Sequence, residues 1–162
     1  MPNPCPCGYY TDKRKICRCN PNKIAAYMGK ISGPLLDRID IHIELPSIKY
    51  KELAETKESE SSAAIKCRVE KTRALQRERF ASDGLFCNTQ MNTKLIRRYC
   101  VLTNEAGELL KTAMTERGLS ARAYDKILKI SRTIADMAGV EMIQDEHIAE
   151  AIQYRSLDRS LF

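Results

Sequence analysis

The sequence predicts a mostly α-helical protein, with a cysteine-rich loop and one strand near its N-terminus and a helical bundle in the C-terminal part of the sequence. Two observations predict this fold class. Apolar side chains alternate with polar ones from Ile39 to Leu45, which is typical of a half-buried strand. From residue 92 onward, capping residues and glycines repeatedly bracket short segments with a helical apolar period, which predicts a small bundle.

The composition is that of a folded protein with a mild excess of positive charge. Its 162 residues suffice for one domain or two small ones. The formal net charge is +6, and most of the excess lies in the first fifty residues, which suits a partner that carries phosphates. The sequence has no long apolar run and no signal-peptide pattern, so we expect a soluble, cytoplasmic protein.

Four of the seven cysteines stand in the first twenty residues as two Cys-x-Cys pairs, Cys5 with Cys7 and Cys17 with Cys19. Two close pairs separated by a short loop can bring four thiolates to one tetrahedral zinc ion, although the usual spacing is Cys-x-x-Cys. The alternatives are two disulfides or four free thiols. An intracellular chain favours zinc over disulfides. The scattered cysteines are interpreted as ordinary thiols: Cys67, Cys87 and Cys100.

A short helix is expected over residues 20–31, because Asn20 can cap it and Pro21 suits its first turn. A Gly-Pro pair then breaks the helix ahead of the expected strand. Arg38 stands immediately before that strand, where it could reach an anion on a neighbouring molecule or pair with a nearby aspartate. The alternating Asp40, His42 and Glu44 are interpreted as the polar face of the strand rather than as a metal site.

Residues 47–62 are polar and charged, and they are the best candidate for a linker. Ser61 or Ser62 can cap the next helix, expected over roughly residues 62–80. Its apolar positions are sparse and it is rich in lysine and arginine. This helix is either a solvated surface helix or a nucleic-acid contact.

The helices expected after residue 92 begin at four capping positions and end at two glycines. Gly118 and Gly139 are the expected C-terminal stops. Arg122 lies in the first turn of the helix that Ser120 caps, where free N–H groups and the helix dipole favour anions. Arg122 is therefore a candidate phosphate contact, with a plain surface arginine as the alternative. The expected N-caps are Asn92 or Thr93, Thr103 or Asn104, Ser120, and Asp145.

Six stretches of the sequence occur in an order that strongly resembles the C-terminal part of the magnesium-chelatase-like AAA+ ATPases of the YifB/ComM group. The resemblance covers nearly the whole chain. It implies the end of an α/β nucleotide-binding core over residues 1–48, a linker and basic helix over 49–91, and a helical lid over 92–162. The stretches are NPCPCGYY (3–10), CRCN (17–20), SGPLLDRIDIHIELP (32–46), ESSAAIKCRVEKTRALQRERF (60–80), GLSARAYDKILKISRTIADMAG (118–139) and EAIQYRSLDR (150–159).

The resemblance also implies roles for three polar residues. Asn3 is similar to the sensor-1 residue that positions the attacking water. Arg38 is similar to the arginine finger that reaches the γ-phosphate held by a neighbouring subunit, and Arg122 is similar to the sensor-2 arginine of the lid. Such arginines accelerate phosphoryl transfer because they stabilise charge on the transferring phosphate. The family further implies ATP and magnesium as ligands, and self-association as a ring, with a hexamer expected.

The family implies a motor that acts on DNA, of the branch-migration helicase type. A chelatase-type motor for metal insertion into a tetrapyrrole is the first alternative. A zinc-stabilised nucleic-acid-binding module without ATPase activity and a helical regulatory domain are the others. The sequence contains no G-x-x-x-x-G-K-S/T phosphate loop and no apolar run ending in Asp-Glu, which in the family lie upstream of such a region. We therefore expect that these 162 residues do not hydrolyse ATP alone.

Overall fold

The chain forms two compact units in the computed structural model. The first comprises Met1–Lys57 and Leu157–Phe162, and the second comprises Glu58–Ser156. The three segments expected from the sequence (1–48, 49–91 and 92–162) stay a prediction about domain organisation. The residues that the structure describes are 3, 5–10, 12, 14–36, 38–43, 45 and 59–155.

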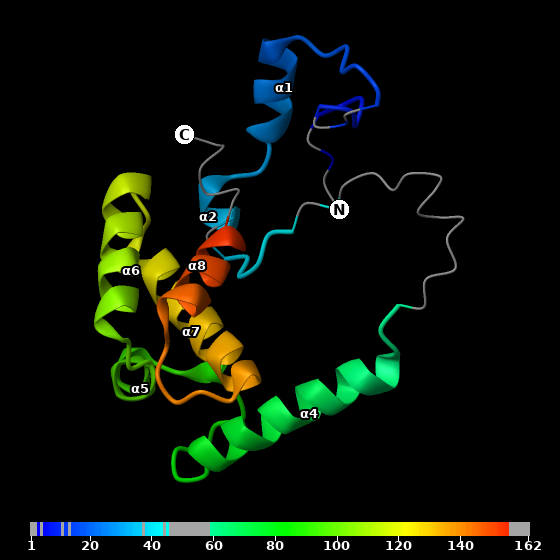
Figure 1. The fold of residues 1–162 in the computed structure, drawn as a ribbon. Helices are drawn as coiled ribbons and strands as arrows, with labels where there is room; N and C mark the ends of the chain where they lie inside the picture. The colour runs from blue at the N-terminus through cyan, green and yellow to red at the C-terminus, as the bar shows by residue number, and fades with distance from the viewer. Residues whose placement is uncertain are drawn as a thin grey trace. The chain divides into compact units, whose positions relative to one another are not determined.

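The first unit contains a cysteine-bearing loop followed by α1 (Pro21–Met28) and the single turn α2 (Gly33–Leu36) (Figure 1). As predicted, Asn20 caps α1: its side-chain oxygen accepts a hydrogen bond from the backbone N–H of Lys23 at 2.8 Å. No residue of α1 is fully buried. Its expected inner face is half-buried, namely Ile24, Tyr27 and Met28, with Ile31 beyond the helix.

The strand expected from Ile39 to Leu45 is not formed in the part of it that the structure describes, residues 39–43 and 45. Its apolar side chains are exposed, Ile41 by 45% and Ile43 by 65%, whereas His42 is only 7% exposed. The prediction that the isoleucines would be buried and His42 would face solvent is therefore wrong here. A strand is stable only when a neighbour supplies a hydrogen-bond ladder, and the isolated bridge recorded in the described residues lies elsewhere, between Leu102 and Ile143. Glu44 lies outside the described residues.

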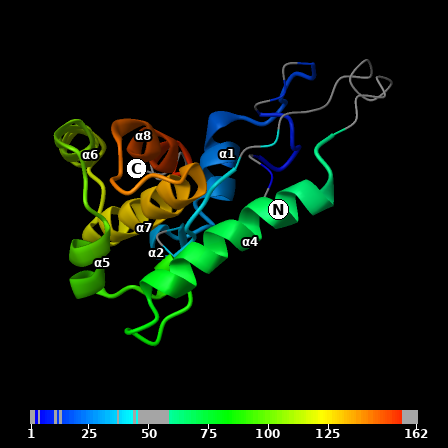
Figure 2. The same ribbon diagram turned by 60° about the horizontal axis from the view of Figure 1, so that its bottom comes forward.

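The second unit is helical, as the sequence predicted, and α7 lies at its centre. Helices α4, α5 and α8 pack against α7, and α6 packs against α8 (Figures 1 and 2). The elements are α4 (Ser62–Arg79), the 3-10 turn η1 (Asn88–Gln90), α5 (Thr93–Tyr99), α6 (Asn104–Arg117), α7 (Ala121–Ala138) and α8 (Asp145–Gln153).

The helix ends lie close to where the capping residues predicted them. Side-chain oxygens of Ser61, Asn92, Thr103 and Ser120 each accept a backbone N–H in the first turn that follows. The two predicted stops, Gly118 and Gly139, adopt left-handed backbone angles with φ of 59° and 74°. The cap expected at Asp145 is wrong by one residue. Gln144 is the N-cap, and its backbone N–H donates to Nδ1 of His147 at 3.0 Å, which fixes the start of α8.

The core of the helical unit is built from the inward faces of α5 to α8. Ile127 of α7 and Ile148 of α8 are fully buried, as is Ile143 between these helices. Replacing such an isoleucine by alanine costs about 2–5 kcal/mol, so this cluster is a large share of the stability of the unit. Ile143 also forms an isolated parallel bridge with Leu102, which ties the segment after α7 to the segment before α6.

A buried ion-pair network attaches α4 to α7. The carboxylate of Asp136 accepts hydrogen bonds from Arg79 of α4 at both oxygens, one of them at 2.7 Å. Arg132, one helical turn earlier on α7, donates to the same carboxylate at 2.9 Å, and Asn88 of η1 donates at 2.8 Å. Charges buried this completely are tolerated because each is paired and hydrogen-bonded. The network therefore fixes the C-terminal half of α4 on the bundle.

No helix in the described part of the chain is long and apolar enough to cross a membrane.

Candidate functional site

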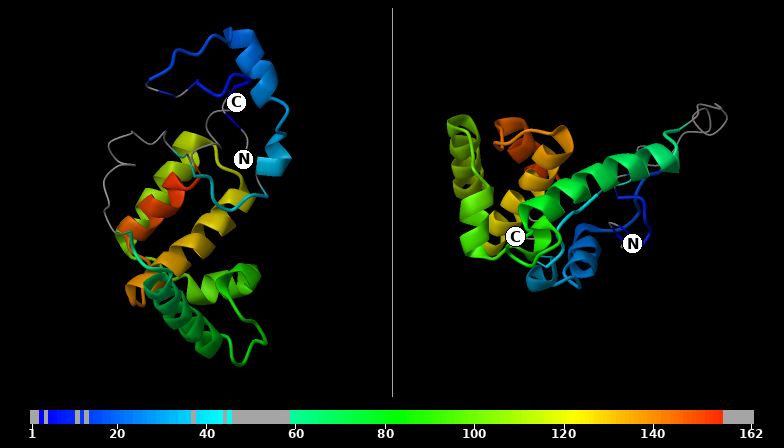
Figure 3. Two further views of the ribbon diagram at one scale, coloured as in Figure 1. Left: turned by 90° about the vertical axis from the view of Figure 1, so that its right-hand side faces the viewer. Right: turned by 90° about the horizontal axis from the view of Figure 1, so that it is seen from below.

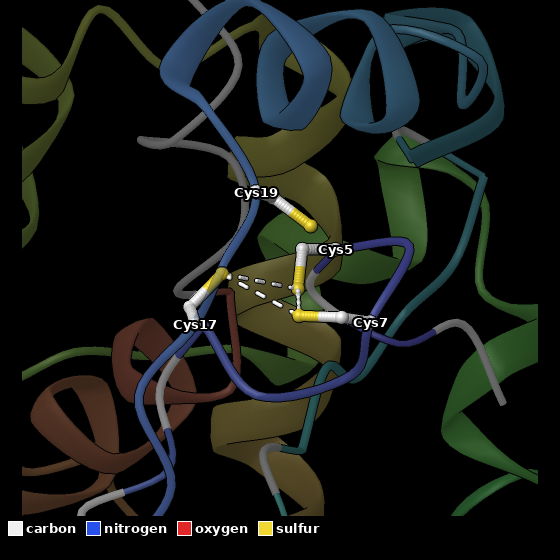
Figure 4. Close-up of side chains that lie close together, drawn as sticks. All are labelled: Cys5, Cys7, Cys17 and Cys19. Carbon is white, nitrogen blue, oxygen red and sulfur yellow. Dashed lines mark hydrogen bonds between the residues drawn. The ribbon is translucent and has the colours of Figure 1, made fainter.

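The four cysteines of the N-terminal loop converge, as the sequence predicted. The Sγ atoms of Cys5 and Cys7 are 3.3 Å apart, and that of Cys17 lies 3.7 Å from Cys5 and 3.5 Å from Cys7. All four sulfur atoms, that of Cys19 included, lie within 4.8 Å of one another. Figure 4 shows the four side chains pointing toward one another from the two arms of the loop. All four cysteines are free thiols, so the two-disulfide alternative is not what the structure shows.

The spacing of these sulfur atoms suits a tetrahedral metal ion. Zinc–thiolate bonds of about 2.3 Å place the sulfurs of a tetrahedral site about 3.8 Å apart, close to the separations found here. Four sulfur donors in a tetrahedral arrangement are the set that zinc or iron prefers. The residues present therefore fit a structural zinc ion.

The backbone of the loop is shaped to hold the first pair of cysteines. Gly8 has a left-handed φ of 81°, and its backbone N–H donates to the carbonyl of Cys5 at 3.0 Å, which closes a tight turn around Cys7. A Cβ placed on Gly8 would lie 3.7 Å from the side-chain nitrogen of Asn3. Asn3, the expected sensor-1 residue, is thus beside the cysteine loop.

The local environment favours the thiolate form of Cys7 and disfavours that of Cys17. A hydrogen bond from the backbone of Tyr9, followed by one from the thiol of Cys5, lowers the pKa of Cys7 to about 6. At Cys17 a hydrogen bond from the backbone of Cys19 also lowers the pKa, but burial and the sulfurs of Cys7 and Cys5 outweigh it and raise the pKa to about 12. A divalent cation at the centre of the cluster would stabilise the further negative charge.

The basic residues of the loop are partly used within it. The backbone N–H of Arg14 donates to Asp12 at 2.7 Å, and the ammonium of Lys15 lies 3.3 Å from the hydroxyl of Tyr9 and 4.8 Å from the centre of its ring. These contacts fold the loop back on itself. Lys13 lies outside the described residues.

Arg38 follows α2 in the first unit, and its side chain is exposed. Its backbone N–H donates to the carbonyl of Leu35 at 3.0 Å, which completes the turn after the helix. The residue before it, Asp37, lies outside the described residues. The turn places Arg38 at the end of the helical turn that Gly33 and Pro34 begin, ahead of a stretch that forms no strand in its described residues.

Arg122 is the second residue of α7 in the helical unit, and it is exposed. The hydroxyl of Ser120 accepts the N–H of Ala123 at 3.1 Å, and the first turn of α7 contains no acidic residue. Among the described residues, Arg122 has no hydrogen-bond or ion-pair partner. Arg38 and Arg122 belong to different compact units, and the cysteines and Asn3 share the unit of Arg38.

A pocket of about 440 Å³ opens between α5 and α7, next to the turn that carries Arg122. Its lining combines apolar side chains, such as Ile96 of α5 and Leu128 of α7, with the charged Arg97 and Asp125. No sequence pattern indicated this pocket. The Arg79–Asp136–Arg132 network was not predicted either, although Arg132 and Asp136 stand four residues apart among apolar positions, a spacing that could have indicated a buried pair.

The remaining cysteines behave as the sequence predicted for ordinary thiols. Cys100 is buried in the core, and its thiol lies 3.7 Å from the carbonyl of Leu128. Burial raises the pKa of Cys100 to about 12, so its thiolate is scarce at neutral pH. Cys67 on α4 is exposed and lies outside the cysteine cluster.

Comparison with known protein families gives matches to both parts of the chain. Residues 1–53 match the family of magnesium chelatase, subunit ChlI, and residues 59–155 match the family of magnesium chelatase, subunit ChlI C-terminal. The boundary between the two matches falls next to the boundary between the two compact units.

Individual relatives extend over almost the whole chain. It is 41% identical over 160 residues to competence protein ComM of Haemophilus influenzae, and 35% identical over 160 residues to the uncharacterized protein YifB of Salmonella typhimurium. Each alignment covers 98% of this chain and 30% of the relative. The chain thus spans about a third of the length of these relatives. It belongs to the magnesium-chelatase ChlI family of AAA+ ATPases, in the group that includes ComM and YifB.

Proposed function

We propose that this chain is the C-terminal part of an AAA+ ATPase that works as a hexameric, ring-shaped motor on DNA, of the branch-migration helicase type. The observation that carries the proposal is the alignment with competence protein ComM over nearly the entire chain. Competence is the uptake of DNA, which favours DNA over a tetrapyrrole as the object of the motor. The chain supplies residues that sense nucleotide, and it contains no phosphate loop of its own.

The proposed roles of the polar residues follow from the chemistry of phosphoryl transfer. Positive charge close to the transferring phosphate stabilises the transition state, and one arginine supplied by a neighbour is worth about 10³–10⁵ in rate. Arg38 is proposed as that arginine finger. Arg122 is proposed as the sensor-2 residue, and its exposed place in an acid-free first turn supports an anion as its partner. Asn3 is proposed as sensor 1, which orients the attacking water.

The cysteine cluster is proposed to hold a structural zinc ion that stabilises the loop beside Asn3. Zinc would contribute folding free energy here rather than catalysis, since four thiolates leave no open coordination position for a substrate. ATP and magnesium are the proposed ligands of the assembled motor, where the phosphates and the metal would be bound by elements other than those of this chain.

Mixing of subunits tests the arginine finger. In a longer protein that includes a phosphate loop, Arg38→Ala and a phosphate-loop variant should each lack ATPase activity. Mixing the two should restore part of it, because some interfaces then combine an intact phosphate loop with an intact Arg38 from the neighbour. Arg117→Ala, at the end of α6, is the control and should retain activity. An Arg38→Ala variant with full turnover would contradict the proposal.

The chelatase alternative is favoured by the name of the matched family, magnesium chelatase. The two functions are separated by what stimulates turnover. A DNA motor should hydrolyse ATP faster when branched or single-stranded DNA is added, whereas a chelatase-type motor should be indifferent to DNA and respond to its partner subunits. Unchanged turnover across a series of DNA structures would therefore favour the chelatase function.

A further inference from the structure

The N-terminal half of α4 extends beyond the other helices of its unit (Figure 3). Every residue from Ser62 to Lys71 is exposed, and the buried positions of the helix, Thr72 and Gln76, lie in its C-terminal half. The Arg79–Asp136 ion pair anchors that half to α7. The helix is therefore held firmly at one end and presents a long solvent-facing surface at the other.

The basic residues of α4 are not equivalent. Arg68 is paired with Glu60 at 2.6 Å, and Arg79 is paired with Asp136, so both charges are already neutralised. The side chains of Arg73 and Arg77 are exposed and have no hydrogen-bond or ion-pair partner among the described residues. Lys66 has only an exposed pair with Glu70, at 3.6 Å, which water and salt weaken.

These three side chains form one row along the helix. Lys66, Arg73 and Arg77 are separated by seven and four residues, which at 3.6 residues per turn places them on the same flank of α4. At a rise of about 1.5 Å per residue the row is about 16 Å long. One strand of DNA advances about 3.4 Å per nucleotide, so a row of this length can follow several consecutive phosphates.

A groove borders the row at Arg73. It has a volume of about 190 Å³ and lies between α4, η1 and α7, with Arg73 on one side and Thr89 and Thr133 on the other. The connection between α4 and η1 also carries Phe86, whose side chain is 67% exposed. Phe86 precedes Cys87, which lines the groove, and an exposed aromatic ring can serve as a stacking platform for an unpaired base.

We propose that the flank of α4 formed by Lys66, Arg73 and Arg77, with the groove beside it, is a contact surface for the phosphate backbone of nucleic acid. The surface rests on the proposed function, action on DNA, and names where this chain would touch its partner. Arginine is the side chain whose planar fork matches a phosphate. A lipid surface is disfavoured, because a helix that lies on a membrane needs a broad apolar face and the large apolar side chains of α4 are few: Ile65, Val69 and Leu75.

The test compares two triple variants of equal charge by the anisotropy of fluorescently labelled single-stranded and duplex oligonucleotides. The first is Lys66→Gln, Arg73→Gln and Arg77→Gln. The control is Lys94→Gln, Arg97→Gln and Lys111→Gln, on α5 and α6, where Lys111 likewise has an exposed acidic partner. The α4 triple should weaken binding about tenfold or more at low salt and lower the log–log salt slope by about 2 to 3, while the control stays near wild type.

The outcomes separate this surface from the proposed function. Equal binding by both triples, or no nucleic-acid binding by the wild-type chain, would overturn the surface. DNA-stimulated ATPase activity of a longer protein reports on the proposed function independently of that result. Binding to vesicles of anionic phospholipid but not to oligonucleotides would identify a membrane contact and would also overturn the surface. Unchanged thermal unfolding of each triple confirms that the variants are folded, and Phe86→Ala should weaken binding to single strands more than to duplexes.

Discussion

Cys5 is the only fully buried member of the cysteine cluster, and its sulfur lies within 3.7 Å of two others. A metal ion bound there would hold the loop through metal–thiolate bonds, which are stronger than hydrogen bonds between thiols. Residue types and spacing were enough to predict this cluster, because ligands so close in sequence have little freedom to diverge. The sequence could not predict how Asn3 lies against Gly8, since that contact depends on a left-handed turn.

At this scale we predict that Cys5→Ser abolishes stoichiometric zinc binding. Structural zinc contributes on the order of 10 kcal/mol to small sites, so loss of one thiolate should also unfold the loop. The measurement is metal content by mass spectrometry of protein purified without added metal, where the wild type should carry close to one zinc per chain. Cys67→Ser, outside the cluster, should leave the metal content unchanged. A metal-free wild type with intact disulfides would contradict the prediction.

Helices of the second unit were predictable because their signals are local. A capping side chain contacts the N–H groups of the next turn, and a glycine stop depends on its own φ angle, as at Gly118 and Gly139. The segment from Ile39 to Leu45 differs, because a strand depends on a neighbour that the pattern does not reveal. The junction of α4 with α7 was also missed, since Arg79 and Asp136 are far apart in sequence and only the fold brings them together.

This junction gives a prediction about pH. Burial raises the pKa of Asp136, but hydrogen bonds from Arg79 and Asn88 and the charge of Arg132 outweigh it and hold the pKa below its usual range. The charged carboxylate therefore stabilises the folded unit above the pKa of an unfolded aspartate, about 3.9, and this stabilisation is lost as the pH falls through the lower folded value. Asp136→Asn should lose about 3–5 kcal/mol near neutral pH, because Arg79 and Arg132 then lack their counter-charge.

Urea unfolding at several pH values measures this effect. The difference between wild type and Asp136→Asn should shrink as the solution is acidified below about pH 4. Glu108→Gln is the control: its pair with Lys111 is exposed on both sides, so its effect should stay within about 1 kcal/mol. A constant difference between wild type and Asp136→Asn from neutral to strongly acidic pH would show that the charge of Asp136 does not stabilise the junction.

For the whole molecule, two independent divisions of the chain agree. Compactness separates Glu58–Ser156 from the rest, and a distinct family match covers residues 59–155. The buried apolar cluster from Phe80 to Ile152 lies entirely within this unit, whereas α1 has no fully buried residue. A domain needs its own core to fold alone. The helical unit has one, whereas the buried side chains among the described residues of the first unit are those of Cys5 and His42.

We therefore predict that residues 59–155 fold without the rest of the chain and that chelation separates the stabilities of the two units. The isolated segment should unfold in one cooperative thermal transition, because it contains every residue of the buried cluster around Ile127, Ile143 and Ile148. In the 162-residue chain, removing the metal with a chelator should abolish the order of the cysteine loop, which amide hydrogen exchange measures. The thermal transition of the helical unit should remain. If chelation instead melted both parts together, the two units would share one folding equilibrium and the division at residue 58 would not be a division in stability.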